Sequence, residues 1–98
     1  MSRYQVDKVL RETVLDADAL ARFAAGPAAY LVGRDLSAEE RRALMEHDYG
    51  ALYALGAHPF LLWGWAARVW ALRGGDKEQF RDRYAAAVRP HGYPDYAT

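Results

Sequence analysis

The segment over residues 59–72 restricts the possible folds of this chain more than any other part of its sequence. It reads PFLLWGWAARVWAL, with large apolar side chains on every side of a helical cylinder and Arg68 as its only charge. A helix that is apolar all round has to be buried over most of its surface. The run is shorter than the roughly 20 residues that cross a bilayer, so it predicts a buried helix and no membrane segment.

Two environments are open for this helix. Either the other helices of the chain wrap it, or a second protein chain covers one of its faces. Tryptophan and arginine are favoured where protein interfaces lose their water. The second alternative therefore predicts that the interface contains Trp63, Trp65, Arg68 and Trp70.

Glycine and proline divide the rest of the sequence into helix-sized pieces. No stretch alternates β-branched and polar residues as a strand does. The length of 98 residues is near the commonest size of one domain. We expect an all-α, compact single-domain bundle of about five helices over residues 1–98. The predicted helices cover residues 3–13, 16–25, 37–55, 59–73 and 77–88, with a short helical stretch at 27–34 and a loose tail over about 89–98.

Capping residues mark several helix ends. Ser37 followed three residues later by Glu40 predicts a capping box, in which each side chain accepts a hydrogen bond from the other residue's backbone N–H. Gly56 suits the left-handed position just past a helix, and Pro59 suits the first turn of the next one. We expect all four residues to have structural roles.

Two polar residues have both a structural and a functional interpretation. Asp48 falls in helical register with Leu44 and Leu52, so we expect it to turn inward and pair with a helix N-terminus or an arginine. This structural role is favoured over a chemical one. His58 stands at a helix start, where it either caps the helix or projects toward a ligand. His47 is expected to face solvent.

Charge and motif content exclude several function classes. Thirteen Lys and Arg residues balance thirteen Asp and Glu, which leaves no net field to attract nucleic acid or an anionic membrane. The chain has no cysteine, its histidines are far apart in sequence, and it contains none of the common catalytic motifs. We therefore expect no catalytic residue and no metal site in this chain. The start of the sequence lacks signal-peptide features, which predicts a cytoplasmic protein.

One region of the sequence resembles a known family through the order and spacing of its residues. The residues that carry the resemblance are Leu36-Ser37, Glu39-Glu40-Arg41, Ala43-Leu44, Asp48, Leu52, Gly56 and His58-Pro59. Together they resemble the small-subunit (LigA-type) family of aromatic-ring-opening extradiol dioxygenases, such as protocatechuate 4,5-dioxygenase. The resemblance covers about residues 16–73 and is most specific over residues 36–62.

The resemblance implies a division of labour between two subunits. In that family the large subunit binds a non-haem Fe(II) through two histidines and a carboxylate, and it opens catechol-type rings with O₂. The small helical subunit packs over it and shapes the substrate pocket. The resemblance thus implies a large catalytic partner that holds Fe(II), and no cofactor in this chain. His58 and Phe60 are expected nearest the active-site mouth, with Tyr49 and Tyr53 as lesser candidates, where they would exclude water.

The alternative function is a stand-alone helical interaction module, either a homo-oligomer or an adaptor, that keeps the family fold without ring-cleavage activity. A homodimer would cover an exposed tryptophan face by symmetry. A complex with a different protein would leave that face uncovered in the isolated chain.

Overall fold

The structure, a computed structural model, describes residues 2–91, with side chains described from Tyr4 onward, and this part of the chain contains helices and no strand. Five helices are eight residues or longer, so the predicted all-α bundle is confirmed. In chain order the elements are α1 (Ser2–Leu15), α2 (Ala17–Ala25), α3 (Pro27–Tyr30), α4 (Ala38–Met45), α5 (Tyr49–Ala54), α6 (Pro59–Leu72), α7 (Lys77–Val88) and the 3-10 helix η1 (Arg89–His91).

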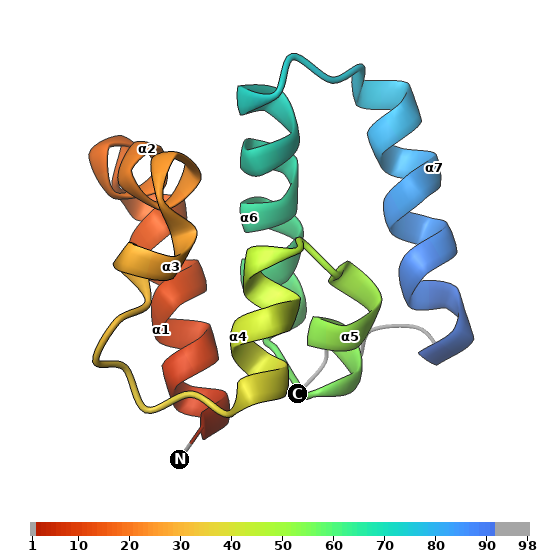
Figure 1. The fold of residues 1–98 in the computed structure, drawn as a ribbon. Coiled ribbons are helices and arrows are strands. Elements are labelled where there is room, and N and C mark those ends of the chain that lie inside the picture. The colour runs from red at the N-terminus through yellow and green to blue at the C-terminus, as the bar shows by residue number, and fades with distance from the viewer. Residues whose placement is uncertain (1, 92–98) are drawn as a thin grey trace.

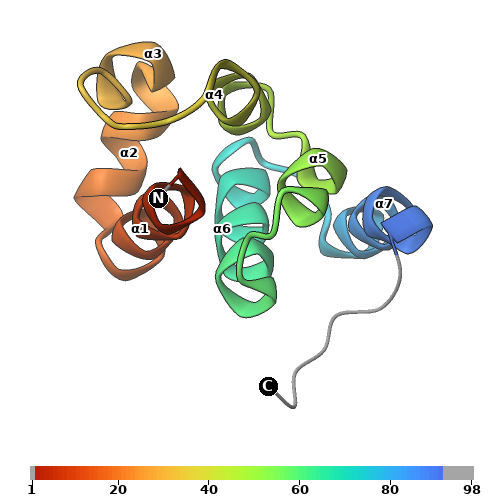
Figure 2. The same cartoon turned by 90° about the horizontal axis from the view of Figure 1, so that it is seen from below.

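Helix α6 lies at the centre of the bundle (Figure 1). Helix α1 packs along one side of it and α7 lies on the other side, while α5 contacts both α6 and α7. Figure 2 shows this order of α1, α6 and α7 from below, with α2, α3 and α4 on one side of the row. The Cα radius of gyration is 12.7 Å, which matches the value of about 13 Å for a compact domain of this size.

The inner side of α6 is wrapped by the chain itself. Leu62, Trp65, Ala66 and Val69 are buried there, and the Trp65 side chain has no exposed surface. Buried residues of α1, α2, α4, α5 and α7 complete the same core. The prediction of Trp65 as an interface residue is therefore wrong, because its ring has no surface left to offer a partner.

The helix predicted over residues 37–55 is two helices. The backbone turns at His47, which has a positive φ of 54°, and Asp48 then caps α5 by accepting a hydrogen bond from the N–H of Ala51 at 3.1 Å. The second carboxylate oxygen of Asp48 accepts from Arg42 at 3.1 Å. Asp48 is thus structural, as expected, but it acts as an N-cap and not as an inward-facing residue in the middle of a helix.

The other predicted caps are present. Ser37 and Glu40 form the reciprocal capping box, with N···O distances of 3.1 Å and 2.7 Å. Gly56 has a φ of 96° after α5, and Pro59 occupies the first turn of α6. These local signals are correct because they depend on only a few neighbouring residues.

The connection from α3 to α4 is held by arginine side chains. Helix α3 has four residues, so it is shorter than the helical stretch predicted over residues 27–34.

Two arginine contacts hold this connection in place. Arg34 pairs with Glu12 of α1 at 2.7 Å, and Arg41 of α4 donates to the carbonyl of Leu31 at 2.7 Å. The Arg34 and Tyr30 hydrogen bonds outweigh the effect of burial and lower the pKa of Glu12, so this carboxylate stays charged.

Helix α7 approaches α5 closely at Gly50. A Cβ atom at this position would lie 2.6 Å from the carbonyl oxygen of Ala87, so a glycine is required for this packing. The chain then continues into η1, which packs against α5. The expected loose tail over residues 89–98 is thus ordered as a 3-10 turn over residues 89–91, and its remainder lies outside the described residues.

Candidate functional site

The start of α6 holds His58 in a defined orientation. Its backbone is extended, with φ −62° and ψ 125°, and its Nδ1 accepts a hydrogen bond from the N–H of Phe60 at 3.2 Å, so His58 is the N-cap of α6. Its own backbone N–H donates to Oδ1 of Asp7 in α1 at 2.8 Å. In a neutral imidazole whose Nδ1 accepts, the proton is on Nε2. His58 therefore presents an N–H donor toward the protein surface.

A shallow groove of about 290 Å³ lies beside His58, between α1 and the start of α6. Asp7, Lys8 and Arg11 supply its charges, and Tyr4 and Leu61 supply apolar surface. The ring of Phe60 lies 6.1 Å from that of His58 and is 60% exposed. This end of the bundle thus combines exposed apolar rings with an imidazole, which suits contact with another surface.

The rings of the two tyrosines contact parts of the fold other than the His58 turn. Tyr49 is half-buried against Trp65, at a ring distance of 6.3 Å, and burial raises the pKa of its hydroxyl. The ring of Tyr53 lies 6.2 Å from His91 of η1. Both tyrosines therefore belong to the side of α5 that meets α7 and η1, and no ring contact in the described chain joins them to His58.

The other predicted interface residues divide by exposure. Trp63 is 39% exposed and Trp70 is half-buried, and both line a groove between α6 and α7. Arg68 is exposed and donates to the carbonyl of Gly64 at 3.1 Å. These three side chains keep surface that a partner can reach, whereas Trp65 does not.

His47 lies in a partly buried environment, which differs from the one expected from the sequence. Its ring packs edge-on against Trp65 at 5.5 Å, and burial, with a smaller effect of Arg73, lowers its pKa to about 4. Its Nδ1 and the Nε1 of Trp65 are both buried without a hydrogen-bond partner. The expectation that His47 faces solvent is wrong, because the turn before Asp48 directs the ring inward. The sequence lacks a glycine or proline that would have signalled this turn.

Comparison with known proteins identifies the family. A family model described as "Aromatic-ring-opening dioxygenase LigAB, LigA subunit" matches residues 12–85. The chain belongs to the LigA family. The LigA match includes α4, α5, α6 and the His58 turn, while Asp7 lies before it. Searches of curated proteins and of solved structures found no match to this LigA-family chain.

Among residues 2–91, no group of three or more His, Cys, Asp or Glu side chains is placed to hold a metal ion. Within the same part of the chain, no helix combines the length and the apolar character needed to cross a membrane.

Proposed function

We propose that this chain is the accessory small subunit of a cytoplasmic extradiol aromatic-ring-cleaving dioxygenase. In this proposal it packs over a large subunit that holds Fe(II), and it shapes the pocket for the aromatic substrate. The observation that carries the proposal is the LigA family match over residues 12–85, which includes every element around His58 except the first part of α1.

The start of α6 is the part of the chain that we assign to the mouth of the partner's active site. His58 offers an N–H donor held in place by the cap and by Asp7, and such a donor can orient a polar group of a substrate. Phe60 and Tyr4 are 60% and 63% exposed, so their rings can exclude water from a covered pocket. The Fe(II) of the large subunit supplies the activation of O₂.

A wider docking surface extends from this end of the bundle along α6. Trp63, Arg68 and Trp70 stay in the proposal as interface residues because each keeps accessible surface. Tyr49 and Tyr53 remain lesser candidates for the pocket, because their rings contact Tyr84 of α7 and His91 of η1.

Recovery of the complex tests the proposal. The tagged full-length chain is purified from extracts of its own host, the bound protein is identified and assayed for iron, and O₂ uptake is measured with a panel of catechols. We expect an iron protein with ring-cleavage activity that is lost on separation and restored when this chain is added back. A homo-oligomer without iron or activity would contradict the proposal and favour the stand-alone interaction module.

Two matched variants locate the docking surface once the complex is in hand. Phe60→Ser removes an exposed ring beside His58, whereas Leu15→Ser removes a side chain that is 75% exposed at the far end of α1. We expect Phe60→Ser to weaken association with the large subunit by about tenfold, a loss that marks a side chain among the few that carry most of the binding energy of an interface. Leu15→Ser should leave it unchanged, and equal effects of the two substitutions would argue against this placement.

A further inference from the structure

The row of α1, α6 and α7 has one covered side and one uncovered side. Helices α2, α3 and α4 lie on one side, and within residues 2–91 no helix lies over the other (Figure 2). Leu62 and Trp65 of α6 are buried toward the covered side. Phe60, Trp63 and Arg68 of the same helix keep exposed surface. We call the uncovered side of the row, with these three residues, the outer face.

The groove between α1 and the start of α6 carries one pair of cations. Lys8 and Arg11 are exposed, lie three positions apart on α1 and both line this groove. The carboxylates next to them are already engaged. Asp7 accepts the N–H of His58, and Glu12 pairs with an arginine that follows α3. Within residues 2–91 neither Lys8 nor Arg11 forms an ion pair, so this α1 pair keeps its charge for a partner.

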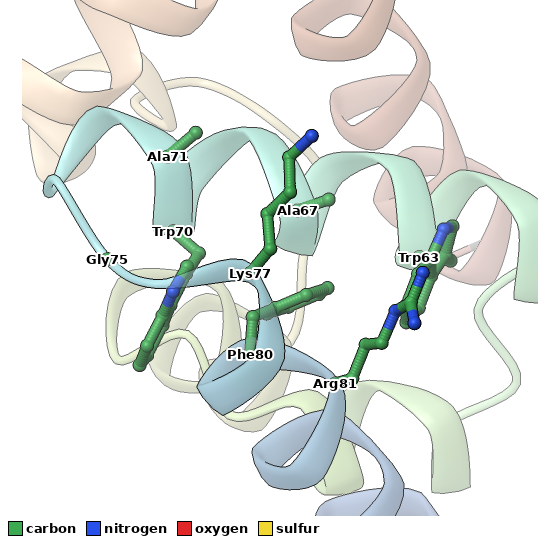
Figure 3. A pocket seen from close by; sticks show the side chains of 8 residues that line it. All are labelled: Trp63, Ala67, Trp70, Ala71, Gly75, Lys77, Phe80 and Arg81. Atoms are coloured by element: carbon green, nitrogen blue, oxygen red, sulfur yellow. The ribbon is translucent and has the colours of Figure 1, made fainter.

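The groove between α6 and α7 carries a second pair of cations. Figure 3 shows Lys77 and Arg81 extending from α7, where they line this groove together with Trp63. They are four positions apart, so they share one side of the helix. The acidic residues Glu78 and Asp82 follow them directly in sequence but do not line the groove. In the described part of the chain neither cation of this α7 pair is in an ion pair.

Negative charge gathers on the covered side of the row, at α4. Glu39, Glu46 and Asp48 all pair with one cation, Arg42. Three carboxylates around one guanidinium leave an excess of negative charge there. The formal net charge of the whole chain is zero. The chain therefore separates its charges, with carboxylates gathered at α4 and unpaired cations on both sides of α6.

We propose that the outer face docks an acidic surface of the large subunit, whose carboxylates pair with the α1 pair and the α7 pair. Apolar side chains of α6, among them Phe60 and Trp63, lie between the two pairs. An apolar centre with a charged rim is the usual arrangement of a protein interface. Lysine and arginine donate charge-assisted hydrogen bonds to carboxylates, and opposite charges on two surfaces speed their encounter.

This inference rests on the proposed function, because the large subunit is its partner. It adds the chemistry of the partner's surface, which does not follow from the family match. Lys8 and Arg11 lie before the matched residues 12–85.

Association kinetics of the recovered complex test the inference. The large subunit and the full-length chain are separated and recombined, and the association rate constant is measured by surface plasmon resonance at several salt concentrations. We expect it to fall as the ionic strength rises, because salt screens the attraction. Lys8→Gln and Arg81→Gln should each lower it by about two- to fivefold at low salt, with a smaller difference at high salt. The dissociation rate constant should change less.

Arg22→Gln is the matched control, because Arg22 is an exposed cation of α2 that lines neither groove. It should leave the kinetics unchanged, and circular dichroism checks that each variant is folded. A rate constant that is independent of salt, or an equal effect of Arg22→Gln, would overturn the inference and leave the ring-cleaving complex standing. Recovery of no iron protein would overturn the proposed function and this inference together. Self-association of the chain that weakens in Lys8→Gln would place a second copy on the outer face and overturn the acidic partner.

Discussion

The backbone N–H of His58 donates a hydrogen bond to Oδ1 of Asp7 at 2.8 Å, which ties the start of α6 to α1 across 51 positions of the sequence. The ring of the same histidine accepts from the N–H of Phe60. Backbone and side chain of His58 are thus fixed by different partners. This arrangement orients the imidazole in the isolated chain, ahead of any binding event.

Loss of the Asp7 carboxylate is expected to loosen this end of the bundle. Asp7→Ala should lower the free energy of unfolding by about 1 kcal/mol, because the N–H of His58 loses its acceptor. Asp7→Asn keeps an oxygen at the same place and should cost less than half as much. Urea denaturation measures both values. Equal losses in the two variants would show that the hydrogen bond is not what matters at this position.

The capping role and the proposed pocket role of His58 can be separated. His58→Ala removes the cap and should destabilise the chain by about 1 kcal/mol, whereas His58→Asn keeps a good N-cap and should have wild-type stability. In the complex both variants lack the imidazole, so both should change the rate or substrate range of ring cleavage. A His58→Asn complex with wild-type kinetics on a panel of catechols would leave His58 with its capping role alone.

Local signals predicted most of the fold, and long-range packing accounts for what they missed. Ser37, Glu40, Gly56 and Pro59 act as their immediate neighbours indicate. The break at His47 was not predictable in this way, because it depends on a ring that packs against Trp65, 18 positions later in the chain.

The candidate site was predicted in part for the same reason. His58 and Phe60 adjoin in sequence, so their proximity follows from the helix start. Tyr49 and Tyr53 share a helix face, but only the position of α7 and η1 decides that their rings meet Tyr84 and His91. The family resemblance proposed these four residues, but it could not predict which of them lie together in the fold.

Trp65 is expected to dominate the stability of the core. Trp65→Ala should lower the free energy of unfolding by about 3–5 kcal/mol, because it leaves a large cavity among buried residues. Trp63→Ala should cost about 1–2 kcal/mol, since its ring is 39% exposed. Thermal and urea denaturation compare the two. A smaller loss for Trp65→Ala than for Trp63→Ala would contradict the burial described for these rings.

The close approach of α5 and α7 predicts that Gly50→Ala is destabilising. The new methyl group would meet the carbonyl oxygen of Ala87, so we expect a loss of about 1–3 kcal/mol even though alanine is the better helix former. Gly26→Ala is the control, because a Cβ there meets only Ala29 at an ordinary 3.8 Å. That variant should stay within about 0.5 kcal/mol of the wild type in urea denaturation.

The lowered pKa of His47 predicts that the folded chain loses stability in mild acid. This pKa is about 4 in the folded chain, against about 6.5 when unfolded, so the unfolded chain binds more protons between these values. The contribution of neutral His47 to the free energy of unfolding is complete above pH 6.5 and is lost as the pH falls toward 4. Allowing for partial exposure, we expect a loss of about 1–2 kcal/mol.

A substitution that keeps the turn isolates this effect. Asparagine tolerates a positive φ, so His47→Asn should fold and should show a flatter dependence of stability on pH between 6.5 and about 4. Urea denaturation at several pH values provides the curves. If His47→Asn follows the wild-type curve, another group is responsible for the acid sensitivity.

The close contact at Gly50 also has a consequence for other members of the family. Only a residue without a β-carbon lets the final helix lie so near α5. A member that carries a larger residue at the equivalent position must place its last helix farther out or in another direction. The residue at this one position of a relative can thus indicate whether that relative shares this arrangement of α5 and α7.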